Sequence, residues 1–229
     1  MIIRDFLNMT GNNDSRECPA IRIFLVRHGQ VQQNAGSIYL GQADIPLSAV
    51  GRIEAASAGE KLLEYEAKPK RIYTSDLERA KETADIISKT LGGFPVIPDK
   101  LFREMAMGTW DGELVEDIKA KFPTEYEKRG DDLRNYRTPG GENFYDLSSR
   151  VTREFHRIFA EDFVCSVDSL NDNLCQDPGD LVIVAHLGVI TALLEELMPE
   201  RQNIREQTTT GSVTVFQAPE WLWPEQARE

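Results

Sequence analysis

The amino-acid sequence predicts an α/β fold, namely a three-layer α/β/α sandwich built around a mainly parallel sheet. Five short runs are apolar throughout, as expected for strands that are buried on both faces. Amphipathic stretches with helical spacing lie between these runs. Histidine and arginine follow two of the runs directly, at the strand ends where α/β sheets bind ligands. The length of 229 residues suits one domain with a single core.

The expected strands begin at Ile21, after a polar segment rich in Asn, Asp and Gly. They cover residues 21–26 (IRIFLV), 71–75 (RIYTS), 94–98 (FPVIP), 181–185 (LVIVA) and 212–216 (SVTVF). We expect residues 1–20 to form a poorly ordered N-terminal extension. No linker composition divides residues 21–229, which are predicted to form a single domain.

The first two helices are predicted from apolar stripes and terminal signals. The stretch 48–67 has Ser48 as N-cap, and its stripe is Ala49, Ile53, Ala56 and Leu63. The stretch 76–92 has the stripe Leu77, Ala80, Ala84, Ile87 and Leu91, with Ser75 and Glu78 spaced as a capping box and Gly92 as the end. Both helices should cover the sheet.

A third helix is predicted further along the chain, and one histidine in it has no expected role. Its stripe consists of Phe144, Leu147, Val151, Phe155 and Ile158. His156 lies off this stripe and is expected to be exposed to solvent. The connection 161–180 that follows is long and carries Cys165 and Cys175, without visible chemistry.

Composition and charge exclude several classes of function. Thirty-eight acidic and 26 basic residues give a net charge of -12, which disfavours nucleic acid and anionic membranes as partners. No apolar run approaches the roughly 20 residues of a membrane span. The N-terminal segment reaches Arg4 and Asp5 before a signal peptide could develop, so a cytoplasmic location is expected. Cys18, Cys165 and Cys175 form no C-x-x-C pair, which argues against structural zinc and a disulfide framework.

The candidate site follows from residues at strand ends. Arg27 and His28 come directly after the first strand, and His186 comes directly after the fourth. A single histidine there is usually a turn or capping residue. Two of only three histidines in such positions, with an arginine alongside, favour a local site for an anion.

Arg79 points to the same conclusion. It lies in the first turn of the second helix, away from the apolar stripe. A cation there opposes the helix dipole, which favours anions at the N-terminus by roughly 0.3–1 kcal/mol. A bound anion would remove this conflict.

Six segments in order resemble one known family. They are LVRHGQVQQN (25–34), GQADIPLSAVG (41–51), YTSDLERAKETA (73–84), REMAMGTWDG (103–112), TPGGENFYDL (138–147) and VIVAHLGVI (182–190). Together they resemble the histidine phosphatase superfamily, with its phosphoglycerate-mutase-like fold, in the phosphatase branch. Within that branch the chain is most similar to alpha-ribazole phosphatases and their broad-specificity relatives.

The resemblance implies a phosphatase that needs no metal or cofactor and hydrolyses a small phosphorylated metabolite through a phosphohistidine. His28 would be the nucleophile, and Glu104 the general acid. The phosphoryl oxygens would be held by Arg27, Arg79 and His186, which supply the charge that phosphoryl transfer needs. The resemblance also places Asn34, Gly41 and Leu187 in the substrate-binding region.

Several positions depart from the family pattern, and two other functions stay open. Gln30, Val31, Ile38 and Leu40, and Ala185 and Leu187 beside His186, replace usual residues, so the phosphate cradle keeps its charges but loses hydroxyls. One alternative is a phosphoglycerate mutase, although the segment 112–139 is short for one. The other is a non-catalytic domain that binds phosphorylated ligands. The oligomeric state is open, with a homodimer as one possibility.

Residues 113–140 are expected to form a variable flap over the pocket, by resemblance to the family. From Lys119 to Arg137 the segment is locally basic in an acidic protein. This charge leads to the prediction that Arg134 or Arg137 contacts a part of the substrate beyond the transferred phosphate. An ordinary solvent-exposed helix face of mixed charge is the alternative.

Overall fold

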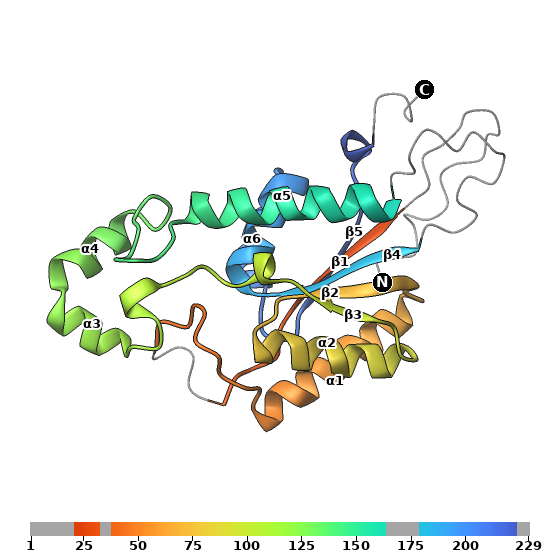
Figure 1. Cartoon of the computed structure of the whole chain (residues 1–229), viewed down its shortest axis with the longest axis horizontal. Helices are drawn as coiled ribbons and strands as arrows, with labels where there is room; N and C mark the ends of the chain where they lie inside the picture. The colour runs from red at the N-terminus through yellow and green to blue at the C-terminus, as the bar shows by residue number, and fades with distance from the viewer. Residues whose placement is uncertain (1–20, 33–37, 164–178, 224–229) are drawn as a thin grey trace.

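The computed structural model describes residues 21–32, 38–163 and 179–223. Several predictions fall outside these ranges, namely those on the extension 1–20, on Asn34, and on Cys165 and Cys175. The described part is drawn in colour in Figure 1.

Within the described residues, a five-stranded sheet forms the centre of the fold (Figure 1). Its strands are β1 (Arg22–Arg27), β2 (Pro69–Thr74), β3 (Val96–Pro98), β4 (Asp180–Ala185) and β5 (Val213–Gln217). The order across the sheet is β3-β2-β4-β1-β5, and only β5 runs antiparallel to its neighbour. All five predicted strands are confirmed, and the sheet is mainly parallel as expected.

Helices cover both faces of this sheet, which confirms the three-layer sandwich. The helices are α1 (Ala49–Glu64), α2 (Glu78–Leu91), α3 (Val115–Lys121), α4 (Pro123–Asp131), α5 (Phe144–Phe163), α6 (Leu187–Leu197) and α7 (Ile204–Gln207). In Figure 1, α1 and α2 lie on one side of the sheet, whereas α5 and α6 lie on the other.

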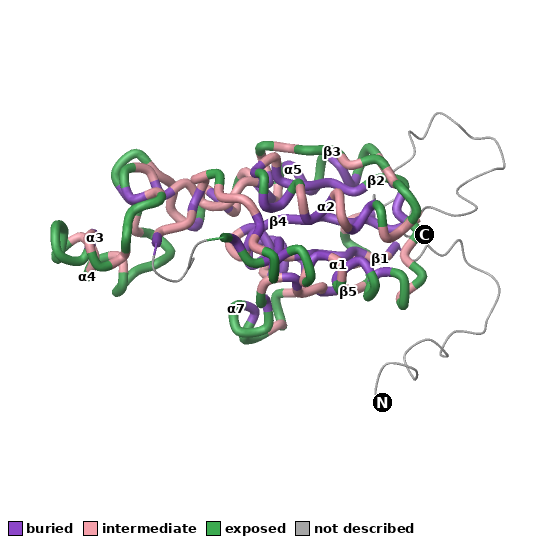
Figure 2. Tube along the Cα trace, turned by 90° about the horizontal axis from the view of Figure 1, so that it is seen from below, coloured by how far each residue is buried: buried purple, intermediate pink, exposed green. Residues whose placement is uncertain are grey.

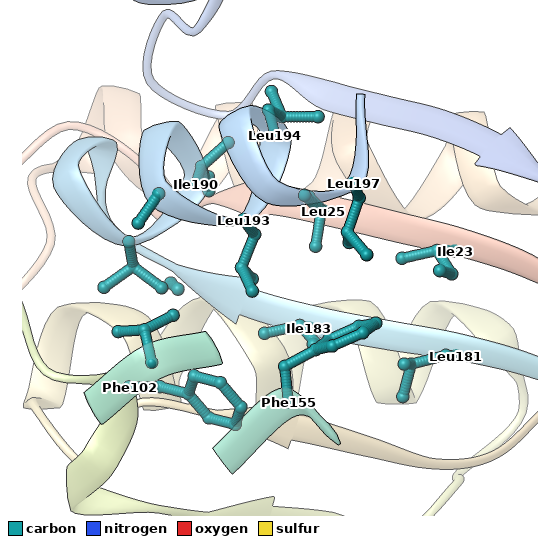
Figure 3. Packing of buried hydrophobic residues seen from close by; sticks show 14 of the residues in the cluster. Ile23, Leu25, Phe102, Phe155, Leu181, Ile183, Ile190, Leu193, Leu194 and Leu197 are labelled. Carbon is teal, nitrogen blue, oxygen red and sulfur yellow. The ribbon is translucent and has the colours of Figure 1, made fainter. Parts of the chain in front are cut away.

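Alternation along β1 shows how the sheet separates two cores. Ile23 and Leu25 pack into the cluster formed with α5 and α6, part of which Figure 3 shows. Phe24 and Val26 point to the opposite face and join the cluster formed with α1 and α2. Since successive side chains of a strand point to opposite faces, a strand between two helical layers must be apolar throughout.

The predicted apolar stripe of α1 is wrong, although its N-cap is confirmed by the bond from Gly51 N to Ser48 Oγ. Ile53 is 70% exposed and Leu63 is 49% exposed. The buried residues are instead Gly51, Ala55, Ala58, Gly59 and Leu62. The physical reason is close approach: a Cβ added at Gly59 would meet the side chain of Thr90 in α2. Helix α1 therefore turns its small residues inward.

Helix α2 starts differently from the prediction and ends as predicted. Its N-cap is Leu77, which provides no side-chain bond, so the predicted capping box does not form. Asp44, in the loop before α1, accepts a bond from Glu78 N at 2.7 Å instead. Gly92 ends the helix in the left-handed conformation with φ 105°, as expected for a C-terminal glycine.

The stripe of α5 is confirmed, because its five predicted residues are all buried. The side chain of His156 is 43% exposed, as expected, and its Nε2 lies 3.4 Å from Glu196.

Helices α3 and α4 lie away from the sheet at one end of the molecule (Figures 1 and 2). A small cluster of Met107, Trp110 and Ile118 forms their core. Among the described helices, none is long and apolar enough to cross a membrane.

Candidate active site

Parallel pairing of β1 and β4 brings His28 and His186 together. Arg27 lies opposite Ala185 in the register, and His28 N donates to Ala185 O at 2.9 Å. The two strands therefore end side by side, and the two imidazole rings follow with centroids 5.0 Å apart. The structure thus brings the two strand-end histidines together.

The ring of His28 is neutral and keeps one ring nitrogen unprotonated. Its Nδ1 lies 2.7 Å from the carbonyl oxygen of Gly29. Because a carbonyl can only accept, Nδ1 carries the proton and Nε2 keeps its lone pair. Burial, followed by the charges of Arg79 and Arg27, lowers the pKa of His28 to about 3. The imidazole is therefore unprotonated at neutral pH.

Arg79 is fully buried and is therefore not a solvent-exposed surface arginine. Its Nη1 donates to Ala43 O at 2.8 Å and its Nη2 donates to Gly41 O at 2.6 Å. These carbonyls fix the guanidinium but do not neutralise it. Its buried Nε has no hydrogen-bond partner. Gly41 therefore contributes by holding Arg79.

Further donors beside His28 are also unsatisfied. Arg27 is held by one bond from Nη1 to Thr208 O at 2.8 Å, and its buried Nε has no partner. His186 is completely buried, and neither ring nitrogen has a partner. Burial, then the charges of Arg79 and His28, lowers the pKa of His186. Buried unpaired polar groups cost about 1–3 kcal/mol each, so this cluster favours an anionic ligand.

Glu104 is the carboxylate that faces the two arginines. Its Oε1 accepts from Met105 N at 2.8 Å, and its Oε2 accepts from Gly188 N at 3.0 Å, in the first turn of α6. Its charge opposes the effect of burial on the pKa of both Arg27 and Arg79. The structure thus places all five predicted catalytic side chains in one site.

Residues that support Glu104 were missed by sequence reasoning. Arg150 from α5 donates to Glu104 O at 3.0 Å and to Leu101 O at 2.7 Å. It also pairs with Glu142 at 2.7 Å, and Glu142 accepts from Ala106 N at 2.9 Å. The only sequence signal was that Glu142 belongs to the PGGE segment.

Glu54 supports the other side of the site and was also missed. From α1 it accepts from Gln30 N at 2.7 Å and from Thr210 Oγ1 at 3.0 Å. It thereby joins the loop after His28 to the segment that carries Thr208.

The other predicted binding residues in the described part of the chain are Leu187 and the two flap arginines. Leu187 begins α6 directly after His186 and is partly exposed. Arg134 pairs with Glu195 at 2.6 Å, and Arg137 pairs with Asp146 at 2.7 Å. Both flap arginines are thus neutralised within the chain, and substrate contact by either stays a prediction.

Comparison with known proteins identifies the family. The profile of the histidine phosphatase superfamily (branch 1) matches residues 23–223. The chain belongs to the histidine phosphatase superfamily. This confirms the family predicted from the six sequence segments.

Phosphatases occur among the relatives of this superfamily member. Phosphoglycerate mutase-like protein 4 of Arabidopsis thaliana is 31% identical over 89% of this chain and 82% of its own. The structure of a mycobacterial glucosyl-3-phosphoglycerate phosphatase is 31% identical, with a TM-score of 0.67 over 86% of this chain and 89% of that one. A putative alpha-ribazole-5'-P phosphatase of Escherichia coli is 25% identical, with a TM-score of 0.70 over 88% and 92%. Together with the family, they confirm the predicted enzyme class, a phosphatase.

Proposed function

We propose that this histidine phosphatase hydrolyses a small phosphorylated metabolite through a phosphohistidine intermediate on His28. The observation that carries the proposal is the set of unsatisfied buried donors on Arg27, Arg79 and His186 around a neutral imidazole. These donors suit the non-bridging oxygens of a phosphoryl group. Phosphoryl transfer depends mainly on such positioning and charge stabilisation.

In the first step, the lone pair of His28 Nε2 attacks phosphorus, and the bond from phosphorus to the leaving-group oxygen breaks. Glu104, in its protonated form, donates its proton to that oxygen, and the alcohol leaves. The bond from His28 Nδ1 to Gly29 O keeps the reactive nitrogen free and stabilises the positive charge that develops on the ring.

In the second step, water attacks the phosphohistidine. Glu104, now a carboxylate, accepts a proton from the water as a new oxygen bonds to phosphorus and the bond to Nε2 breaks. Inorganic phosphate leaves, and His28 returns to its neutral form. Arg150 and Gly188 N hold Glu104 in place for both steps.

Rapid-quench labelling with a ³²P-labelled phosphomonoester tests this proposal. We expect an acid-labile, alkali-stable phosphoryl group on His28 in the wild-type enzyme. His28→Ala should lose the label and at least about 99% of kcat, because the nucleophile is removed. His156→Ala is the matched control, because that exposed histidine lies outside the site, and it should keep full labelling and rate.

Two results would contradict the proposed function. An active His28→Ala enzyme would exclude this nucleophile. A label that passes to a second position of the substrate, in place of phosphate release, would identify a mutase.

A further inference from the structure

Asp111 is an acidic residue whose carboxylate binds the backbone of a distant segment. Its Oδ1 accepts from Gly41 N at 2.9 Å, and its Oδ2 accepts from Gln42 N at 2.7 Å. Within the described part of the chain, these two bonds are the hydrogen bonds of the carboxylate, and it forms no ion pair. The negative charge of Asp111 therefore acts mainly on the two peptide groups that it binds.

Backbone pairing brings Asp111 to this position. An antiparallel bridge joins Ile38 to Leu114, and next to it Gly112 N donates to Tyr39 O at 2.8 Å. The carboxylate of Asp111 accepts the two N–H groups that follow in the loop 41–43. Because backbone N–H groups need an acceptor when they are shielded from water, the carboxylate continues the pairing beyond the bridge.

One peptide group connects Asp111 with Arg79. The N–H of Gln42 and the carbonyl of Gly41 belong to the same peptide group. The N–H donates to Asp111 Oδ2, and the carbonyl accepts from Arg79 Nη2 at 2.6 Å. A carboxylate bound to the N–H polarises the peptide group and makes its carbonyl a stronger acceptor, because hydrogen bonds in a chain strengthen one another. The charge of Asp111 thus acts on a bond that holds Arg79.

Arg79 depends on this loop for its orientation. Within the described residues, its hydrogen bonds go to Gly41 O and Ala43 O, both in the loop. Burial is the main cause that lowers the pKa of Arg79, and the charge of Asp111 is among those that oppose it. The buried Nε has no partner and stays available to a ligand. A guanidinium matches two phosphoryl oxygens only when its plane is fixed, so the loop sets how well Arg79 binds them.

The same loop also reaches Glu104, but that residue has other support. Gln42 Nε2 donates to Glu104 O at 3.1 Å, and Arg150 Nη2 donates to the same oxygen at 3.0 Å. Two backbone N–H groups outside the loop hold the carboxylate of Glu104. A change at Asp111 should therefore affect Arg79 far more than Glu104.

We propose that Asp111 is a positioning residue of the phosphatase reaction, which orients Arg79 through the peptide group between Gly41 and Gln42. This inference rests on the proposed function and adds a residue that does not touch the substrate. Arg79 stabilises the phosphoryl oxygens most strongly in the transition state. Loss of the Asp111 carboxylate therefore lowers kcat more than it raises KM.

A double-mutant cycle with Asp111→Asn and Arg79→Met tests the inference. Asn has the shape of Asp but offers one acceptor oxygen and no charge, and Met removes every donor of Arg79. With p-nitrophenyl phosphate, we expect Asp111→Asn to lower kcat/KM roughly tenfold or more in the wild-type background, mainly through kcat. When Arg79→Met is already present, the further loss should be less than about threefold, because Asp111 acts through Arg79.

A crystal structure of Asp111→Asn with orthovanadate provides a second measurement that needs no Arg79 variant. Asp111 is only partly buried and Asn has the same shape, so this variant should fold, and urea unfolding checks that it does. We expect the guanidinium of Arg79 to shift away from Gly41 O relative to the wild-type complex. Glu113→Gln is the control, because it removes an exposed carboxylate two residues away and should keep the wild-type kcat/KM.

Three results would overturn the inference. They are wild-type activity in folded Asp111→Asn, equal losses from this substitution with and without Arg79→Met, and an unchanged Arg79 guanidinium in the variant structure. In each case the wild-type enzyme would still be labelled on His28. A wild-type enzyme without the label would overturn the proposed function itself.

Discussion

His28 and His186 are buried beside two arginines, and this environment couples the protonation of the site to stability. The pKa of His28 is lowered to about 3, and the pKa of His186 is also lowered, mainly by burial. An unfolded histidine has a pKa near 6.5. Between pH 6.5 and 3 the unfolded state therefore binds more protons, so stability falls as the pH is lowered through this range.

This linkage predicts a measurable difference between the wild-type protein and His28→Asn. Across pH 4.5–6.5, the wild-type free energy of unfolding should fall more steeply, by up to about 1.4 kcal/mol per pH unit for the one proton. Urea unfolding at several pH values measures the two slopes. Parallel curves would show that His28 is not kept neutral by its surroundings. Inorganic phosphate should reduce the loss of wild-type stability at low pH, because an oxyanion stabilises protonated histidine.

At the residue scale, position relative to the strands made the site predictable. Arg27, His28 and His186 follow buried strands, and this placement carries a clear sequence signal. Arg150 carries no such signal. Its importance comes from a contact with a residue distant in sequence, the carbonyl of Leu101. A contact of this kind produces no periodicity and no motif in the sequence.

At the scale of elements, one backbone contact sets the distance between α1 and the loop after β1. A Cβ added at Gly29 would overlap the carbonyl oxygen of Gly51, and a Cβ added at Gly51 would overlap that of Gln30. These neighbours are backbone atoms, so no rotamer change can relieve the overlap. The loop that carries His28 thus depends on glycine in a helix of another segment.

Gly51→Ala should therefore impair both stability and activity. We expect a loss of about 1–3 kcal/mol, typical of overpacking, together with a lower kcat because the His28 loop shifts. Gly130→Ala in α4 is the control, since a Cβ there meets nothing within 4 Å. That variant should gain about 0.5–1 kcal/mol from helix propensity. Urea unfolding and phosphatase assays measure stability and activity for both variants. If Gly51→Ala keeps the stability and activity of the wild type, the loop adapts freely to the added methyl group.

The close backbone approach at Gly51 also explains why the sequence predicted that α1 is a helix but did not predict which of its faces is buried. The stripe of large apolar residues identified α5 correctly. In α1, however, glycine and alanine form the packed face, whereas Ile53 is exposed. A rule based on hydrophobic size fails where backbones approach closely.

At the scale of the whole molecule, positive charge is concentrated at one site of an acidic protein. The net charge is -12, yet Arg27 and Arg79 both lie beside His28. Within the described residues, no group of three or more His, Cys, Asp or Glu side chains has the arrangement of a metal site. The arginines can supply the electrostatic stabilisation that a metal provides in other phosphatases.

We therefore expect hydrolysis to proceed at an unchanged rate in excess EDTA. The measurement is the initial rate of phosphate release before and after dialysis against chelator. Loss of activity that magnesium or zinc restores would refute metal independence. Orthovanadate, which resembles the phosphoryl transition state, should inhibit equally with and without chelator.

The sequence predicted the strands and the layers of the molecule but left the order of the strands open. Apolar runs show that a strand is buried, and they say nothing about which strand lies beside it. The sequence likewise did not indicate that the edge strand β5 runs antiparallel to β1. The order β3-β2-β4-β1-β5 comes from the structure.

The pairing of β1 with β4 also has a consequence for biosynthesis. Arg22 and Asp180, which join the two strands at 2.7 Å, are 158 residues apart in the chain. On the ribosome, β1 must wait for most of the domain to be translated before its neighbour emerges, and contacts of such long range form slowly. Until then His28 has no His186 beside it. If hydrolysis proceeds as proposed, the nascent chain should lack phosphatase activity until β4 pairs with β1, and the first appearance of activity would report that pairing.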